Sequence, residues 1–193
     1  ADVGELAKMT GAKVVGNGAL PYQLVIYGMV DAKQVMSMNK SGTITPIGPD
    51  IKITMVPAEH SSALTVKDPA SGETRRVFAG ASVGHVIELE NGFRIYHTGD
   101  TGIFGDMALI NALMPPDLAL VSIGGHFTMD PKGAAFAMRE LVKPKKVIPI
   151  HYGTFPPLKG TPAQFRSALG PSSIEVLDVE PGQAVSLFGL FCC

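Results

Sequence analysis

Four polar side chains stand just past apolar segments that we expect to be strands: His60, Asp100, His126 and His151. In layered α/β sheets, the loops beyond strand ends are where side chains from distant parts of the chain converge. Imidazole and carboxylate together suit zinc and neighbouring first-row divalent ions. Three protein ligands and one open position are the usual plan of a hydrolytic metal, which lowers the pKa of its bound water. The four residues therefore indicate a metal site at one edge of a sheet.

Each of these residues also has a plainer interpretation. A single histidine after a strand is more often a structural hydrogen-bonding group than a ligand, and we assign that structural role to His85 and His97. Asp100, within Gly-Asp-Thr-Gly, can be an Asx-turn residue. A serine nucleophile in the segment 60–62, His-Ser-Ser, is a weaker alternative, because neighbours on an irregular loop rarely face each other for proton transfer. Metal chemistry is the favoured hypothesis among these.

The elements that must position the four residues follow from hydrophobic periodicity, which switches repeatedly between helical and extended and predicts one α/β domain over residues 1–193. We expect strands at residues 12–15, 51–56, 85–89, 93–96, 117–123, 145–150, 174–177 and 184–188. We expect helices ending near residue 10 and at 20–30, 106–113, 131–142 and 161–169. Asn91-Gly92 predicts a hairpin with a type I′ turn, and residues 66–76 read as a long surface loop.

Composition limits the partners. The chain has 193 residues with 16 Lys and Arg against 17 Asp and Glu, and no basic run, so nucleic acid is not an expected partner. Apolar stretches are strand-length, so we expect a soluble protein without a membrane partner. Cys192 and Cys193 are adjacent and cannot form a disulfide framework, which favours the cytoplasm. The apolar end that carries them is a candidate contact with a second copy.

Four segments, in this order, resemble the later motifs of the metallo-β-lactamase superfamily, and within it the small metal-dependent hydrolase branch. They are residues 58–62 (AEHSS), 95–107 (IYHTGDTGIFGDM), 123–129 (IGGHFTM) and 147–155 (VIPIHYGTF). The resemblance covers nearly the whole chain. It implies an αβ/βα sandwich with a two-metal site in a cleft at one edge of two facing sheets.

The resemblance also implies a role for each candidate residue. His60 matches a ligand of the first metal, Asp100 the carboxylate that bridges both metals, and His151 a ligand of the second. His126 matches a position near the mouth of the site, where it would polarise substrate or donate a proton. The implied cofactors are two divalent ions, zinc or else manganese. The implied reaction is attack by metal-bound hydroxide on an ester, lactone, amide or phosphoester bond of a small-molecule substrate.

One motif of the superfamily, HxHxDH, is absent from this sequence. We expect the chain to begin just after it, which would leave the sandwich incomplete at its N-terminus, with apolar surface open. Metal binding by the chain alone would then be weak and would need a complementing N-terminal segment. Two alternatives remain: a non-catalytic scaffold or assembly module that has lost metal, and, less favoured given the neutral charge balance, a metal-dependent nuclease.

Overall fold

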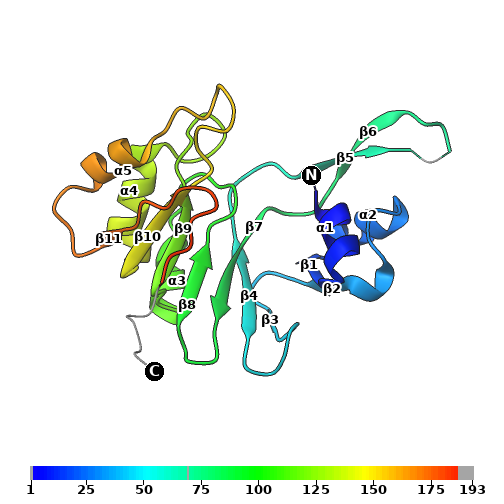
Figure 1. Cartoon of the computed structure of the whole chain (residues 1–193), viewed down its shortest axis with the longest axis horizontal. Coiled ribbons are helices and arrows are strands. Elements are labelled where there is room, and N and C mark those ends of the chain that lie inside the picture. The colour runs from blue at the N-terminus through cyan, green and yellow to red at the C-terminus, as the bar shows by residue number, and fades with distance from the viewer. Residues whose placement is uncertain (1, 69, 187–193) are drawn as a thin grey trace.

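The computed structural model describes residues 2–68 and 70–186. A large mixed sheet with helices forms one part of the molecule, and a smaller N-terminal part lies beside it (Figure 1). Within residues 2–68 and 70–186, no helix is long and apolar enough to cross a membrane.

The large sheet has seven strands in the order β11-β10-β9-β8-β7-β4-β3. These strands are β3 (Thr43–Ile44), β4 (Lys52–Pro57), β7 (Val83–Glu88), β8 (Arg94–His97), β9 (Leu118–Ser122), β10 (Lys146–Ile150) and β11 (Glu175–Val176). Strands β8 to β11 pair in parallel, whereas β3, β4, β7 and β8 pair antiparallel. Because β8, β9 and β10 run in one direction, the segments that follow them leave the sheet at the same edge.

Three helical segments cover one face of this sheet. They are α3 (Met107–Leu113), α4 (Pro131–Phe136) with its π-helical continuation (Ala137–Val142), and α5 (Pro162–Leu169). The largest buried side chains of the resulting core include Tyr96, Met107, Met138 and Phe165. The helix starts are locally encoded: Thr161 and Gln164 form a capping box at α5, and both α4 and α5 begin with proline.

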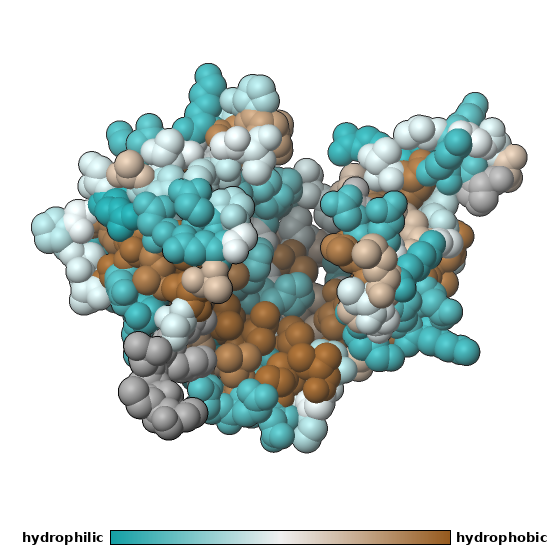
Figure 2. Space-filling view, viewed as in Figure 1, coloured by the Kyte–Doolittle hydropathy of each residue, from teal (hydrophilic) through white to brown (hydrophobic). Residues whose placement is uncertain are grey.

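The opposite face of the sheet carries a cross-strand row of isoleucines. Ile53 pairs with Ile87, and Ile87 pairs with Ile95, so the three side chains share one face. They alternate with Val86 and Tyr96, which point into the helix-covered core. All three isoleucines are half-buried, and Figure 2 shows hydrophobic side chains gathered between the two parts of the molecule.

The smaller part packs around a core of its own. It comprises α1 (Val3–Thr10), β1 (Val14–Asn17), α2 (Ala19–Ile26), a 3₁₀ turn (Ala32–Gln34) and β2 (Val35–Met38), which pairs in parallel with β1. Ala7, Leu24 and Val30 form its buried hydrophobic cluster. Buried Asn17, at the end of β1, donates from Nδ2 to the carbonyl of Ala81 at 2.7 Å and so ties this part to the segment before β7.

Most expected elements are present, and three details were wrong. The turn between β7 and β8 is not type I′, because Asn91 does not have a positive φ; Gly92 alone does, at 79°. The Leu89 carbonyl accepts from the Gly92 N–H at 2.9 Å, so the loop is an ordinary three-residue connection with glycine in the left-handed position.

The second error concerns residues 66–76, which are not a loop throughout. Residues 66–67 and 74–76 belong to an antiparallel hairpin of β5 (Ala63–Lys67) and β6 (Thr74–Phe78), and residues 70–76 are exposed, as expected of a surface segment. The third error is the expected strand at 184–188: residues 184–186 are irregular, and 187–188 lie outside the described residues.

The buried hydroxyl of Tyr96 generates a stability prediction. Tyr96 is fully buried, its hydroxyl has no hydrogen-bond partner among the described residues, and burial raises its pKa. Since an unpaired buried polar group costs about 1–3 kcal/mol, Tyr96→Phe is expected to raise the free energy of unfolding by about 1 kcal/mol in urea denaturation. The exposed Tyr22→Phe is the control and should change nothing. A lower free energy for Tyr96→Phe would contradict the unpaired hydroxyl.

Candidate functional site

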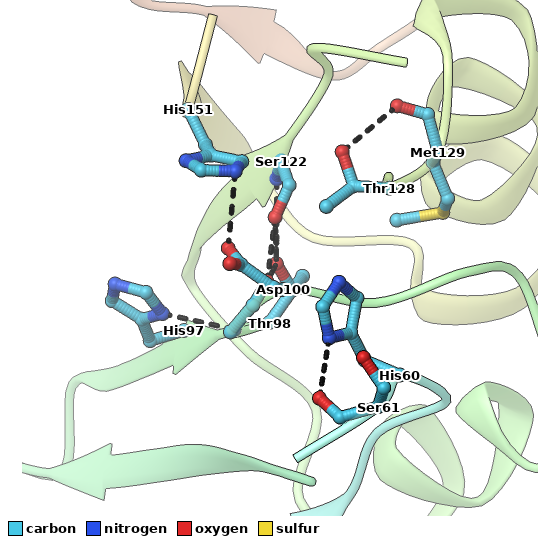
Figure 3. A network of polar contacts seen from close by, with 10 residues as sticks. His60, Ser61, His97, Thr98, Asp100, Ser122, Thr128, Met129 and His151 are labelled. Carbon is cyan, nitrogen blue, oxygen red and sulfur yellow. Dashed lines mark hydrogen bonds and ion pairs between the residues drawn. The ribbon is translucent and has the colours of Figure 1, made fainter. Parts of the chain in front are cut away.

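Asp100 and His151 meet at the edge of the sheet where β8 and β10 end. The Nε2 atom of His151 lies 3.5 Å from Oδ1 of Asp100, and the two side chains are 28% and 49% exposed. Figure 3 shows the two side chains pointing toward one another. Two residues that lie 51 positions apart in sequence thus form a solvent-accessible pair of potential metal ligands.

His60 approaches this pair from the loop after β4. Its Nδ1 lies 2.7 Å from the carbonyl oxygen of Ser61 (Figure 3), and because that oxygen can only accept, Nδ1 carries the proton. The lone pair of Nε2 is then available to a metal, as in many sites where a carbonyl fixes the tautomer of a ligand histidine. His60 and Asp100 both line a cavity of about 440 Å³.

The donor types fit a divalent ion of the zinc class, but their number is small. Within the described parts of the chain, no three or more His, Cys, Asp or Glu side chains lie close enough together to hold one ion. A catalytic zinc usually has three protein ligands. The structure therefore brings Asp100 and His151 together and puts His60 on a shared cavity, without completing a ligand set.

His126 lies at a different opening of the same edge. It is exposed and lines a cavity of about 640 Å³ together with Lys159 and Gln164. Its ring meets the edge of Phe127 with centroids 4.3 Å apart. Asp100 lines the other cavity, with His60, so His126 lies apart from that pair of potential ligands.

Both histidines that follow parallel strands have strained backbones. The φ angles are 59° at His126 and 56° at His151, a left-handed conformation that non-glycine residues rarely adopt. Strain of this kind concentrates at functional sites, where the surrounding structure holds it for the sake of a side chain's direction. Four non-glycine residues of the described chain have a positive φ, the other two being Ser41 and Lys143, so half of them fall on residues singled out by type and position.

A buried hydroxyl pair fixes the start of the Asp100 loop. Thr98 and Ser122 are fully buried, and their hydroxyls lie 3.2 Å apart. Both donate to the carbonyl of Gly99, at 2.8 Å and 2.5 Å. Gly99 itself has φ 65°, and a Cβ there would come within 2.6 Å of the Val83 carbonyl, so no larger residue fits before Asp100.

Thr101, just after Asp100, connects three of the loops. Its hydroxyl accepts from the Glu59 N–H at 2.9 Å, in the loop that carries His60. Its carbonyl accepts from the Met129 N–H at 2.9 Å, in the loop that carries His126. The Glu59 carbonyl in turn accepts from Gly102 at 2.8 Å. Since Thr101 is fully buried, these bonds hold the three loops together away from water.

His85 and His97 lie opposite one another on β7 and β8, below the candidate site. The Gly99 N–H donates to Nδ1 of His97 at 3.0 Å, consistent with the structural role expected of it. Burial, together with the charge of His97, lowers the pKa of His85. Burial also lowers the pKa of His97, and Asp100 partly opposes that shift. Nε2 of His85 is buried with no partner in the described parts of the chain.

Comparison with known proteins identifies the class. The beta-lactamase superfamily domain matches residues 8–152, so the chain belongs to that family, as its motifs predicted. Among curated relatives, a UPF0173 metal-dependent hydrolase of Cupriavidus necator is 50% identical over 186 residues, covering 95% of this chain and 64% of the relative. Another, from Roseiflexus castenholzii, is 43% identical over 189 residues, covering 96% of this chain and 73% of the relative.

Solved structures agree on the fold. Igni18, described as a metallo hydrolase of Ignicoccus hospitalis, aligns with a TM-score of 0.79 at 32% identity, over 96% of this chain and 72% of that one. The metallo-β-lactamase fold protein YhfI of Bacillus subtilis aligns with a TM-score of 0.59 at 12% identity, over 91% and 69%, which supports the fold alone. The chain spans 64–67% of the length of the first four curated relatives.

The sequence singled out the candidate residues by type and position but not the buried residues that hold their loops in place. Thr98, Thr101 and Ser122 were not singled out, although all three are buried polar residues beside the candidate site. The sequence feature that could have indicated them is the pair of threonines, Thr98 and Thr101, on either side of Gly99-Asp100. Hydroxyl groups of this kind recur in turns, so the pattern alone did not separate them from surface residues.

The Thr101 hydroxyl can be tested by an isosteric change. Thr101→Val leaves the Glu59 N–H without its acceptor and is expected to lower the free energy of unfolding by about 2 kcal/mol, whereas Thr101→Ser keeps the acceptor and should lose about half as much. Urea denaturation measures both. Thr154→Val, at an exposed loop position, is the control and should change stability by less than about 0.5 kcal/mol. Equal losses for Thr101→Val and Thr101→Ser would argue against the hydroxyl bond.

His85 gives a prediction about pH. Because its pKa is lower in the folded than in the unfolded chain, unfolding takes up a proton below the unfolded pKa of about 6.5. The free energy of unfolding should therefore be highest above that pH and fall as the pH drops toward 5.5. His85→Gln removes the titrating group and should flatten this slope in denaturation series at constant ionic strength. An unaltered slope would show that His85 does not contribute to it.

Proposed function

We propose that the protein is a metal-dependent hydrolase whose ion is held in part by Asp100 and His151. The observation that carries this proposal is their contact, Nε2 to Oδ1 at 3.5 Å, at the edge of the parallel strands. Relatives that are 43–50% identical are named metal-dependent hydrolases, and Igni18 is described as a metallo hydrolase. Those names support the reaction type and leave the scissile bond open.

Each residue has a part that its position supports. The Asp100 carboxylate has two oxygens, so it can serve two divalent ions at once, zinc in preference to manganese. His151 provides one imidazole ligand, beside Asp100. His60, whose Nε2 lone pair is free, provides a second imidazole from the cavity that it shares with Asp100. The ions, when bound, lower the pKa of water and so supply a hydroxide nucleophile near neutral pH.

His126 acts at the mouth of the site. Its exposed ring can donate a proton to the leaving group or polarise the bond under attack, on an ester, lactone, amide or phosphoester of a small molecule. The near-neutral charge of the chain supports a small-molecule substrate over nucleic acid, and the absence of a disulfide framework supports a cytoplasmic setting.

The small number of potential metal ligands indicates that further side chains are needed to complete the site. Two or three side chains in the described residues are fewer than two ions require, so a segment with the superfamily motif HxHxDH would supply the others. The second candidate function, a non-catalytic scaffold or assembly module, is favoured by the same small ligand count. It predicts a chain that stays free of metal at saturating zinc and forms a defined oligomer.

The test combines metal content with hydrolysis, in the 193-residue chain with and without a fused segment that carries HxHxDH. Close to two ions per chain are expected in the fused form by elemental analysis. Asp100→Ala or His151→Ala should lower kcat/KM by roughly a thousandfold or more, and His126→Ala by about 100-fold to 10,000-fold. Asp106→Ala removes an exposed carboxylate at the N-cap of α3 that makes no side-chain capping hydrogen bond, and it should behave as wild type. Full hydrolysis by Asp100→Ala would refute the proposal.

A further inference from the structure

Two phenylalanines lie exposed beside the candidate site. Phe127 is 51% exposed and follows His126 directly, while Phe155 is 46% exposed and lies four residues after His151. They come from the loops after β9 and β10, which leave the sheet at the same edge. We call this pair of side chains the aromatic lip.

The aromatic lip connects the two histidines. The centroids of Phe127 and Phe155 are 6.4 Å apart with their planes tilted by 41°. Phe127 meets His126 edge to face at 4.3 Å, and Phe155 meets His151 edge to face at 6.4 Å. These separations lie in or near the range of favourable aromatic contacts, so the four rings form one continuous row. Any group that packs on the aromatic lip is therefore next to both histidines.

Hydrogen bonds hold both ends of the aromatic lip in place. The Phe127 N–H donates to the Gly125 carbonyl at 2.6 Å, and the Gly125 N–H donates to Met129 at 3.0 Å. The Phe155 carbonyl accepts from the Leu158 N–H at 3.0 Å. Leu158 is buried, so this second loop is anchored in the core. Because these loops are already ordered, binding a ligand on their apolar surface does not cost the conformational entropy of ordering them.

We propose that the aromatic lip binds an apolar part of the substrate, an aryl ring or a short acyl chain, with the bond to be cleaved lying toward Asp100 and His151. The cleavage step rests on the proposed function. The binding step rests on the geometry of Phe127 and Phe155 alone.

The size of the aromatic lip favours a small molecule over a protein. A phenylalanine side chain buries about 150–250 Å², so two half-exposed rings offer on the order of 200 Å². A stable protein interface buries about 1,200–2,000 Å² in total. The offered area matches one ring or a short chain, and its position against His126 and His151 favours an occupant that reaches the candidate site.

The experiment uses phenylacetate and acetate as probes, which share a carboxylate and differ in the apolar group. Dissociation constants come from ligand-detected NMR titrations of the protein. Phenylacetate should bind more tightly than acetate, and Phe127→Ala or Phe155→Ala should weaken phenylacetate roughly tenfold. Phe127→Leu and Phe155→Leu keep apolar area and should give intermediate values. Phe136→Ala, 47% exposed on α4, is the matched control and should bind phenylacetate as wild type does.

A kinetic readout separates this inference from the proposed function. If the fused protein cleaves methyl esters, the ratio of kcat/KM for methyl phenylacetate to methyl acetate should fall roughly tenfold in the alanine variants. If it cleaves neither ester, hydrolysis of that bond has failed, while the NMR titrations still report on the aromatic lip. Equal affinity of wild type for the two probes, or unchanged phenylacetate affinity in the double alanine variant, overturns the inference. A wild-type dimer that dissociates in the double variant, seen by sedimentation, also overturns it.

Discussion

The buried side chain of Thr101 is the point at which the candidate site is held together. One hydroxyl and one carbonyl of this residue bond to the loops that carry His60 and His126, while its own loop carries Asp100. Those loops leave three different strands. The Gly102 N–H bond to the Glu59 carbonyl and the Ser122 hydroxyl bond to the Gly99 carbonyl add further connections between them. Parallel alignment of β8, β9 and β10 brings their ends to one edge, and Thr101 then sets the distances at that edge.

Much of this arrangement was predictable from sequence, for identifiable reasons. Runs such as residues 118–122 consist of apolar and small side chains between breaking residues, so strand β9 was clear. The β5–β6 hairpin was missed because Thr74, Arg75 and Arg76 are polar and β6 is mostly exposed, so it lacks the apolar alternation that predicts a strand. The turn type at Asn91-Gly92 was wrong, since a three-residue connection needs only Gly92 in the left-handed region.

The candidate residues were also identifiable by type, whereas their contacts were not. A pattern of strand ends selects Asp100 and His151, but it cannot say that their side chains meet at 3.5 Å, since that distance depends on the register of β8, β9 and β10. The proposed ligand roles came from resemblance to a superfamily, whose membership is confirmed over residues 8–152. The buried hydroxyls that support Asp100 follow from tertiary packing, which leaves little trace in local sequence.

The left-handed backbones at His126 and His151 have an evolutionary consequence. Each costs about 1–3 kcal/mol relative to a relaxed residue, and glycine would remove nearly all of that cost. Substitutions that increase the free energy of unfolding would therefore favour glycine over histidine at both positions. Selection for the function of the two imidazoles opposes that replacement. Lineages released from that selection should show glycine at these two places before they show damage in the core.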